Sequence, residues 1–364
     1  MQRERNYGID MLRILSMLMI CIHHTIVHGI WGNDIQITSQ FYYNGIIIEI
    51  IYFFTVCAVN CYALISGYVG IESKWKLSNI MKLWIQVVFY CVVITTVMKL
   101  SGMQDIGIKQ AVHSVSPIIL GQYWYFAAYF GMYFLIPVFN AGINNLNKVQ
   151  IKLLLAAIFF VFTVLPLWKK GETFSLEQGY SCLWLSLLYI CGACIRKLNV
   201  SRKISKHGMG AYIILLSIVY IGSHVLRKLL GYVGCYVDIL GRLNKYTSPI
   251  IFTAAICLLL YFSQVQLSSK AKRITAFLAP MTFGVYLIHD NGLIRNTLIK
   301  GSFAIYKTMP PMKMVCAILG TAIAIYLICS IIDWFRIKLF NLLKINEFCK
   351  NIEDKIRNVL LKIL

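Results

Sequence analysis

One stretch of the sequence decides the fold, residues 5–28, which read RNYGIDMLRILSMLMICIHHTIVH. It is long and apolar enough to form a membrane-spanning helix, which needs about 20 residues. Within it lie a carboxylate, a guanidinium and three imidazoles: Asp10, Arg13, His23, His24 and His28. Ionisable groups are costly at bilayer depth, so a row of them indicates a candidate functional site.

The spacing of these residues places most of them along one face of a helix. Asp10 precedes Arg13 by three residues, so the two side chains are within reach of an ion pair. His24 follows Arg13 by eleven residues, which is three turns plus about 20° and a rise of about 16 Å. His28 lies on the same face, whereas His23 is rotated by about 100°. We therefore expect Arg13 at the entrance of a groove and His24 deep inside it.

Each of these residues alone also has an ordinary structural explanation. An arginine near the end of a span extends its guanidinium to the interface, and a histidine forms hydrogen bonds with neighbouring helices. The aligned set of Asp10, Arg13 and His24 favours a functional site instead. We treat these three as candidate catalytic residues.

The composition describes a polytopic membrane protein. Of its 364 residues, 59% are hydrophobic and 13% are charged, and the mean hydropathy is +0.70. A soluble domain of this length carries about twice that charged fraction. The net charge of +21 comes from Lys and Arg between apolar runs, which is a topology pattern and no sign of nucleic-acid binding. The C-x-x-C pair of Cys191 and Cys194 is expected to pack between helices rather than to hold a metal.

Ten apolar segments are long enough to cross a bilayer, so we predict an all-α fold of about ten transmembrane helices. They cover about 11–31, 45–69, 79–100, 122–139, 151–168, 180–196, 209–226, 247–266, 276–296 and 312–335. Lys and Arg are more frequent on the side of the N-terminus, which predicts that both termini are cytoplasmic. We expect no cleavable signal peptide. The chain divides into a transmembrane domain at 1–335 and a basic amphipathic cytoplasmic tail at 336–364.

Four further residues are candidates for substrate binding, and each has a second explanation. Glu49 either neutralises a histidine of the first helix or lies at the interface. Lys82 either meets an anionic donor from the cytosol or anchors its helix. Trp124, in a Tyr-Trp-Tyr-Phe cluster, either stacks on a sugar ring or belongs to an aromatic belt at the interface. His289, beside Asp290 at mid-depth, either takes part in catalysis or makes a structural hydrogen bond.

Together these residues resemble a known family. The opening R-x-x-x-I-D-x-L-R, with His24 eleven residues after Arg13, resembles that of the membrane acyltransferase-3 family. The S-G-Y at 66–68, the aromatic cluster around Trp124 and the G-V-Y-L-I-H that ends at His289 occur in similar places in that family. The pattern N-Y-G-I-D-x-L-R-I-x-S-M, followed by a histidine pair, resembles the branch found with bacterial surface-polysaccharide genes.

The resemblance implies a multi-pass enzyme of the bacterial plasma membrane. Such enzymes transfer an acyl group, usually acetyl, from acyl-CoA to a hydroxyl of a cell-surface polysaccharide or of its lipid-linked precursor. Acetyl-CoA is then a donor substrate, with no bound cofactor and no metal. The family's Arg and His fall on Arg13 and His24. The family often has R-x-x-R at the start of the third span, where this chain reads KLWIQ at 82–86, so that pattern is absent.

On this hypothesis His24 either takes the proton of the acceptor hydroxyl or is itself acylated. Arg13 binds a phosphate or the carbonyl oxygen of the donor, for which a guanidinium fork is suited. Asp10 orients Arg13, and Glu49 or His28 sets the tautomer of His24. The partners are the lipid bilayer, acyl-CoA and a glycan or lipid-linked glycan acceptor, and a homo-oligomer is compatible with the sequence.

Two other classes of protein also fit about ten spans with polar residues at mid-depth. One is a transporter or flippase of a lipid-linked or small polar substrate, although the sequence shows no two-fold repeat and no paired broken helices. The other is a membrane sensor or scaffold, which does not need an aligned Asp10, Arg13 and His24. The sequence does not identify the sugar, the hydroxyl or the acyl chain.

Overall fold

A computed structural model describes residues 5–32, 42–107, 112, 114–116, 121–168, 174–200, 202–232 and 239–363. Across these residues the regular structure is helical, without a strand, as the apolar segments predict. The first half contains α1 (Tyr7–His24), η1 (Thr25–Ile30), α2 (Tyr42–Thr55), α3 (Ala58–Gly70), α4 (Leu77–Leu100), α6 (Trp124–Asn145), α7 (Lys148–Phe159), η3 (Phe160–Val164), η4 (Leu165–Leu167), η5 (Glu177–Gly179) and α8 (Cys182–Leu198). The second half contains α9 (Arg202–Ser205), α10 (Gly208–Tyr232), α11 (Ile239–Leu243), α12 (Pro249–Gln264), α13 (Ser269–Leu278), η6 (Ala279–Met281), α14 (Thr282–His289), α15 (Gly292–Ile294), η7 (Arg295–Ile299), η8 (Ala304–Thr308), α16 (Pro311–Leu342) and α17 (Ile345–Ile363).

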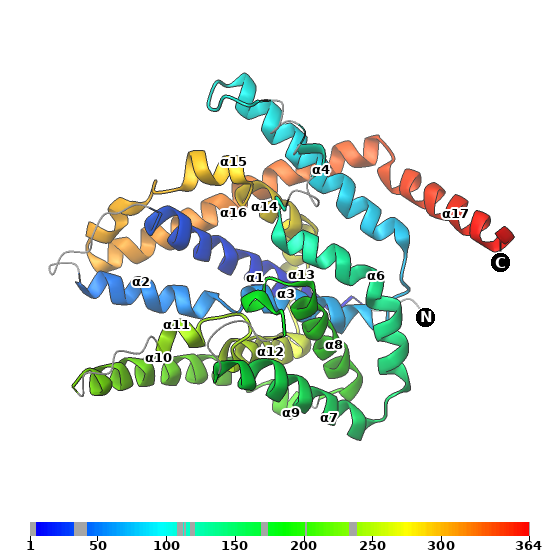
Figure 1. The fold of residues 1–364 in the computed structure, drawn as a ribbon. Helices are drawn as coiled ribbons and strands as arrows, with labels where there is room; N and C mark the ends of the chain where they lie inside the picture. Colours follow the sequence, from blue (N-terminus) through cyan, green and yellow to red (C-terminus); the bar gives the residue numbers. More distant parts are fainter. Residues whose placement is uncertain are drawn as a thin grey trace.

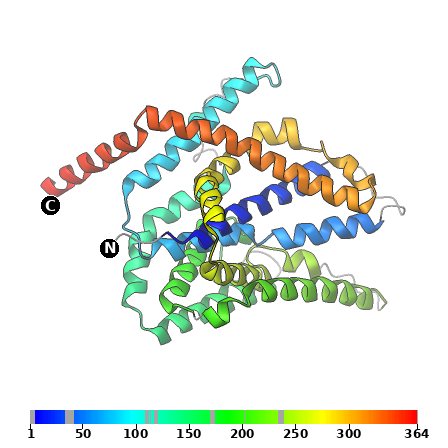
Figure 2. The ribbon, with the colours of Figure 1, turned by 180° about the vertical axis from the view of Figure 1, so that it is seen from behind.

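Helix α1 runs through the middle of the bundle (Figures 1 and 2). It packs against α2, α3, α12, α13, α14 and α16. In the most apolar part of the Tyr7–Ile30 span 61% of the residues are buried, against 17% for Lys148–Leu167 and 22% for Gly208–Leu230. The helix with the ionisable row is therefore enclosed by others, whereas α7 and α10 present their apolar side chains outward, where lipid covers them.

Every predicted segment is largely helical, but three of the ten do not form a helical stretch long enough to span a membrane. Within the described residues, seven helical stretches are long and apolar enough to span a membrane. The predicted spans at 180–196 and 247–266 correspond to the shorter helices α8 and α12, and the one at 276–296 is divided among α13, η6, α14 and α15. The chain is a polytopic all-α membrane protein, and the count of ten remains a prediction.

Two apolar segments that the sequence predicts as continuous are broken at mid-length. The second span breaks at Val56 and Cys57, between α2 and α3, and the ninth breaks at Asp290 and Asn291, between α14 and α15. The prediction placed no break in either segment. Val56 and Cys57 include no proline or glycine, whereas Asn291 and the glycine after it form a dipeptide typical of turns. At the second break the Asn291 side chain accepts a hydrogen bond from the Leu293 amide and so begins α15.

Both ends of the described chain lie at the same end of the bundle (Figure 1), as an even number of spans requires. The predicted boundary at residue 335 falls inside α16, which continues to Leu342. The Arg336–Asp333 ion pair spans this boundary. The amphipathic tail helix is α17, which packs on α4. There the Glu353 carboxylate accepts hydrogen bonds from the amides of Leu77 and Ser78, in the first turn of α4. The bonds from Ser78, above all, hold the pKa of Glu353 below its usual value.

Candidate active site

Helix α1 places Asp10, Arg13 and His24 at the distances that their spacing in the sequence predicts. It is a continuous α-helix that begins at an Asn6 cap, so Arg13 and His24 are separated by a rise of about 16 Å. The Asp10 carboxylate is buried and accepts from Arg13 NH1 at 2.6 Å and from Arg5 Nε at 2.5 Å. The Asp10–Arg13 pair is the one expected from the sequence, and Arg5 is an additional partner.

At His24 the helix changes its winding. Residues Thr25–Ile30 form a π-helix, a rare conformation that often occurs at functional sites. The wider turn leaves the carbonyls of His28 and Gly29 free to accept from the amides of Gly301 and Phe303. The rings of His24 and His28 remain neighbours, with centroids 5.0 Å apart.

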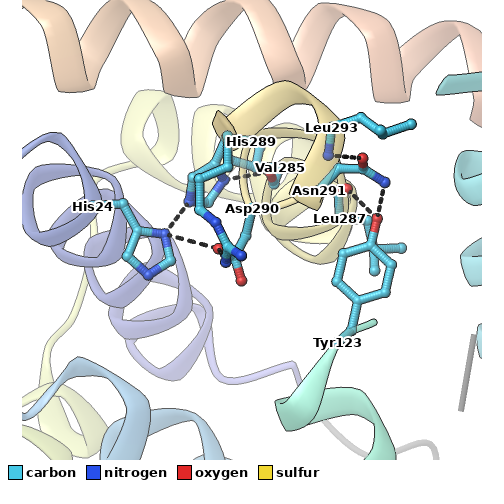
Figure 3. Close-up of polar contacts among 9 residues, drawn as sticks. His24, Tyr123, Val285, Leu287, His289, Asp290, Asn291 and Leu293 are labelled. Atoms are coloured by element: carbon cyan, nitrogen blue, oxygen red, sulfur yellow. Dashed lines mark hydrogen bonds and ion pairs between the residues drawn. The ribbon is translucent and has the colours of Figure 1, made fainter. Parts of the chain in front are cut away.

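The partner of His24 is His289, at the C-terminal end of α14 (Figure 3). His24 Nδ1 lies 3.0 Å from His289 Nε2, and His289 Nδ1 lies 2.6 Å from the Val285 carbonyl oxygen. A carbonyl oxygen only accepts, so His289 Nδ1 carries a hydrogen and, in the neutral ring, its Nε2 is an acceptor. His24 Nδ1 must then donate, which leaves the lone pair of His24 Nε2 unused by this chain of hydrogen bonds.

An ion pair between Asp290 and Arg295 lies beside the same nitrogen of His24. Asp290 Oδ1 lies 3.7 Å from His24 Nδ1 and accepts from Arg295 NH1 at 3.0 Å. Next to it, Asn291 donates to the Tyr123 hydroxyl, which in turn donates to the Leu287 carbonyl (Figure 3). The break after α14 is therefore held by hydrogen bonds, and it keeps His289 and Asp290 facing α1.

His24 lines a narrow cavity at the centre of the bundle, with a volume of about 50 Å³. Its other walls are apolar and aromatic: Met17, Ile20, Val59, Tyr62, Trp124, Tyr125, Tyr246, Phe283 and Tyr286. The volume has room for about three or four water-sized groups. An imidazole in such a cavity is suited to proton transfer with a small reactant.

A metal ion has one candidate set of ligands among the described residues. His24, His28 and Asp290 each offer a ligand atom, all within 4.8 Å of one another. However, the Asp290 oxygen is already held by the Arg295 guanidinium, and His24 Nδ1 faces His289. A cation would have to compete with Arg295, so the hydrogen-bonded arrangement is favoured, and the absence of a metal remains a prediction.

The structure brings together three of the predicted residues and separates the others. His24, Trp124 and His289 meet at the central cavity or beside it. Trp124 is thus part of the cavity wall, with its ring 4.5 Å from that of Tyr180. Asp10 and Arg13 lie together about three turns away, toward the end that carries both termini.

Two predicted substrate-binding residues face elsewhere. Glu49 lies on α2 toward α10, where it accepts from the Tyr220 hydroxyl at 3.0 Å and lies 3.4 Å from His224 Nε2. The expectation that Glu49 neutralises a histidine of the first helix was wrong, because α10 supplies its partners. Lys82 lies near Cys349 of α17 and lines neither the central cavity nor the pocket described below. This position supports the anchoring role for Lys82.

Several cavity residues were not singled out from the sequence. Tyr62 comes from α3, Tyr286 from α14 and Tyr246 from the turn before α12. In a chain with 22 Tyr and 20 Phe, an aromatic residue on an apolar helix carries no signal of its own. Arg295 had a weak signal, a cation just after the His289-Asp290 pair.

Comparison with known proteins identifies the family of the chain. A family model described as an acyltransferase domain, acyltransferase-3, matches residues 6–330. The chain belongs to this family. No curated protein and no solved structure matched the chain significantly. The protein is therefore a membrane acyltransferase, and the match includes α1, the central cavity and the His289 segment.

Proposed function

We propose that this acyltransferase transfers an acetyl group from acetyl-CoA to a hydroxyl of a bacterial cell-surface polysaccharide or of its lipid-linked precursor. The observation that carries the proposal is the hydrogen bond between His24 and His289 beside the central cavity. It leaves His24 Nε2 as a proton acceptor. The small volume of the cavity supports a short acyl group rather than a long one.

His24 acts as a general base in this proposal. Its Nε2 takes the proton of the acceptor hydroxyl while the oxygen attacks the thioester carbonyl carbon. The tetrahedral intermediate then breaks its C–S bond, and the proton passes from His24 to the departing thiolate. The products are an ester and free CoA, so atoms and charges balance.

Arg13 binds a part of the donor far from the reacting carbon. Because it lies about 16 Å along α1 from His24, it does not reach a carbonyl placed at His24 Nε2. The phosphates of the donor, or its amide-containing arm, are the groups within its reach. In this proposal Arg13 therefore binds the phosphates or the amide-containing arm and not the carbonyl oxygen.

We therefore expect Arg13→Lys to raise the KM for acetyl-CoA by about tenfold, because a lysine keeps the charge but loses the paired donors. The turnover number at saturating donor should change much less. The measurement is initial-rate kinetics in isolated membranes with varied acetyl-CoA. An unchanged donor KM would remove Arg13 from donor binding.

The central test compares His24 with its neighbour His23. His23 lies on another face of α1, with its ring stacked on Tyr52 at 4.6 Å. In a strain that lacks the gene, wild-type protein and His23→Ala should restore a mass increase of one acetyl group per polysaccharide repeat. His24→Ala should not, at equal protein levels in the membrane.

Mass spectrometry of the polysaccharide decides the outcome. If the His24→Ala strain still acetylates its polysaccharide, His24 has no place in the mechanism. If wild-type protein causes no mass change, the polysaccharide acceptor is wrong. Broken helices at mid-depth also occur in transporters. A transporter would change the amount of exported polysaccharide and leave its acetylation unaltered.

A further inference from the structure

A second cavity lies at the end of the bundle where α1 begins. It has a volume of about 530 Å³, within the range of small-molecule sites. Its walls come from the start of α1, the ends of α3, α8 and α12, and the first turn of α13. Unlike the central cavity, it is polar, and its described lining contains three cations, Arg5, Arg196 and Lys272, and no carboxylate.

Two of these cations converge on one aromatic ring. The Arg5 guanidinium lies 5.4 Å from the centroid of the Tyr7 ring, and the Lys272 ammonium lies 5.7 Å from it. Arg5 is paired with Asp10, whereas the described residues hold no carboxylate against Lys272. Two cations on one ring repel each other, and an anion between them would relieve that repulsion.

The third cation, Arg196 of α8, is held in place by other residues of the bundle. Arg196 donates to both carboxylate oxygens of Glu72, at 2.7 and 3.0 Å, and to the Tyr68 hydroxyl. Its position is thus fixed before any ligand arrives. A guanidinium that is oriented in advance loses less entropy when it binds a phosphate.

The floor of the cavity is also fixed. Asn6 donates to the Ser263 carbonyl at 3.0 Å, and a side chain at Gly8 would come within 2.1 Å of the Phe262 carbonyl oxygen. The start of α1 is therefore packed directly on the end of α12. Asp10 connects Arg5 in this cavity to Arg13 deeper in the bundle.

We propose that this cavity binds the phosphate groups of a nucleotide, with Lys272, Arg5 and Arg196 as their cationic partners. The inference rests on the proposed function in one respect, that the nucleotide is the coenzyme A part of the donor. From this cavity the donor's arm runs along α1 past Arg13 toward His24. Tyr7 to His24 is a rise of about 25 Å, so only a long, narrow ligand occupies both sites.

The test uses adenosine 3′,5′-bisphosphate as the probe and the full-length protein in phosphatidylcholine nanodiscs. Isothermal titration calorimetry should show binding that weakens as salt is raised. Lys272→Gln should weaken it by about three- to tenfold, and Lys272→Gln with Arg5→Gln by more. Lys270→Gln is the matched control, because Lys270 lies on the same helix but does not line the cavity. Adenosine without phosphate should not bind.

Binding of the bisphosphate without any polysaccharide acetylation would refute the proposed function and leave this inference intact. The inference itself fails if the wild type does not bind the probe, or if Lys272→Gln and Lys270→Gln behave alike. A repeat in nanodiscs that contain phosphatidylglycerol separates a soluble nucleotide from a lipid headgroup. Lys272-dependent retention of that lipid, without nucleotide binding, also overturns the inference.

Discussion

His289 determines which nitrogen of His24 is available for chemistry. Because His289 Nδ1 donates to the Val285 carbonyl, its Nε2 receives the hydrogen of His24 Nδ1. The second ring nitrogen of His24 points away from both His289 and Asp290 (Figure 3). The sequence assigned this orienting role to His28 or Glu49, but the residue that performs it lies 265 positions away.

We expect His289→Leu to lower the turnover number by about 100-fold or more, because His24 loses the acceptor that selects its tautomer. His289→Gln should recover part of the activity, since its amide oxygen also accepts a hydrogen bond. The check is turnover against pH for both variants, with their amounts matched by size-exclusion chromatography. If both variants lose the same amount of activity and keep the pH profile of the wild type, then His289 has only a structural role.

Among the helices, α3 and α8 approach each other most closely. A Cβ atom at Gly67 would lie 1.8 Å from the Tyr189 carbonyl oxygen, and one at Gly192 would lie 2.0 Å from the Leu64 carbonyl oxygen. Small residues allow such backbone contact between membrane helices. The S-G-Y pattern at 66–68 thus has a packing role, and it supports the helix that carries Tyr62 to the cavity.

Gly67→Ala should therefore lower the Tm of the purified protein by about 5 °C or more, because the helix backbones must separate. Gly222→Ala on α10 is the control, since nothing lies within 4 Å of its added Cβ. Thermal unfolding followed by fluorescence measures both. If the two variants have the same Tm, then α3 and α8 are not in close backbone contact in solution.

Over the whole molecule, the described chain begins and ends on one side (Figure 1). The cationic cavity is lined by the start of α1 and therefore lies on that side as well. The distribution of Lys and Arg predicts that this end is cytoplasmic. Under the proposed function, the donor would then enter beside Arg5 and extend along α1 to His24. The acceptor would approach from the lipid or from the outer face.

A fusion at the C-terminus tests this orientation. Green fluorescent protein fused after Leu364 should fluoresce in cells, and alkaline phosphatase at the same place should be inactive, because it folds only outside the cytoplasm. Both readings come from intact cells with equal fusion levels. If the phosphatase fusion is active and the fluorescent fusion is dark, the C-terminus lies outside the cytoplasm. That result would exclude entry of the donor from the cytosol at this end.

The sequence by itself determined the class of fold, the helical segments and the Asp10–Arg13 pair. These follow from local quantities, namely the length of apolar runs and the constant rise and rotation of a helix. It also identified Trp124 and His289 as candidate site residues, without a position for either in the fold. It missed the π-helix after His24, where a single glycine marks no change of winding, and the break after Asp290, although the Asn-Gly dipeptide there is typical of turns.

Only the tertiary structure decided which side chains meet. His24 with His289, Glu49 with His224, and Lys272 with Tyr7 are each separated by well over a hundred residues, so no helical periodicity relates them. In a bundle most outward and inward faces are alike in apolar composition, so the sequence does not say which neighbour a polar group will find. Packing settles that, because a buried polar group is stable only where another helix offers it a partner.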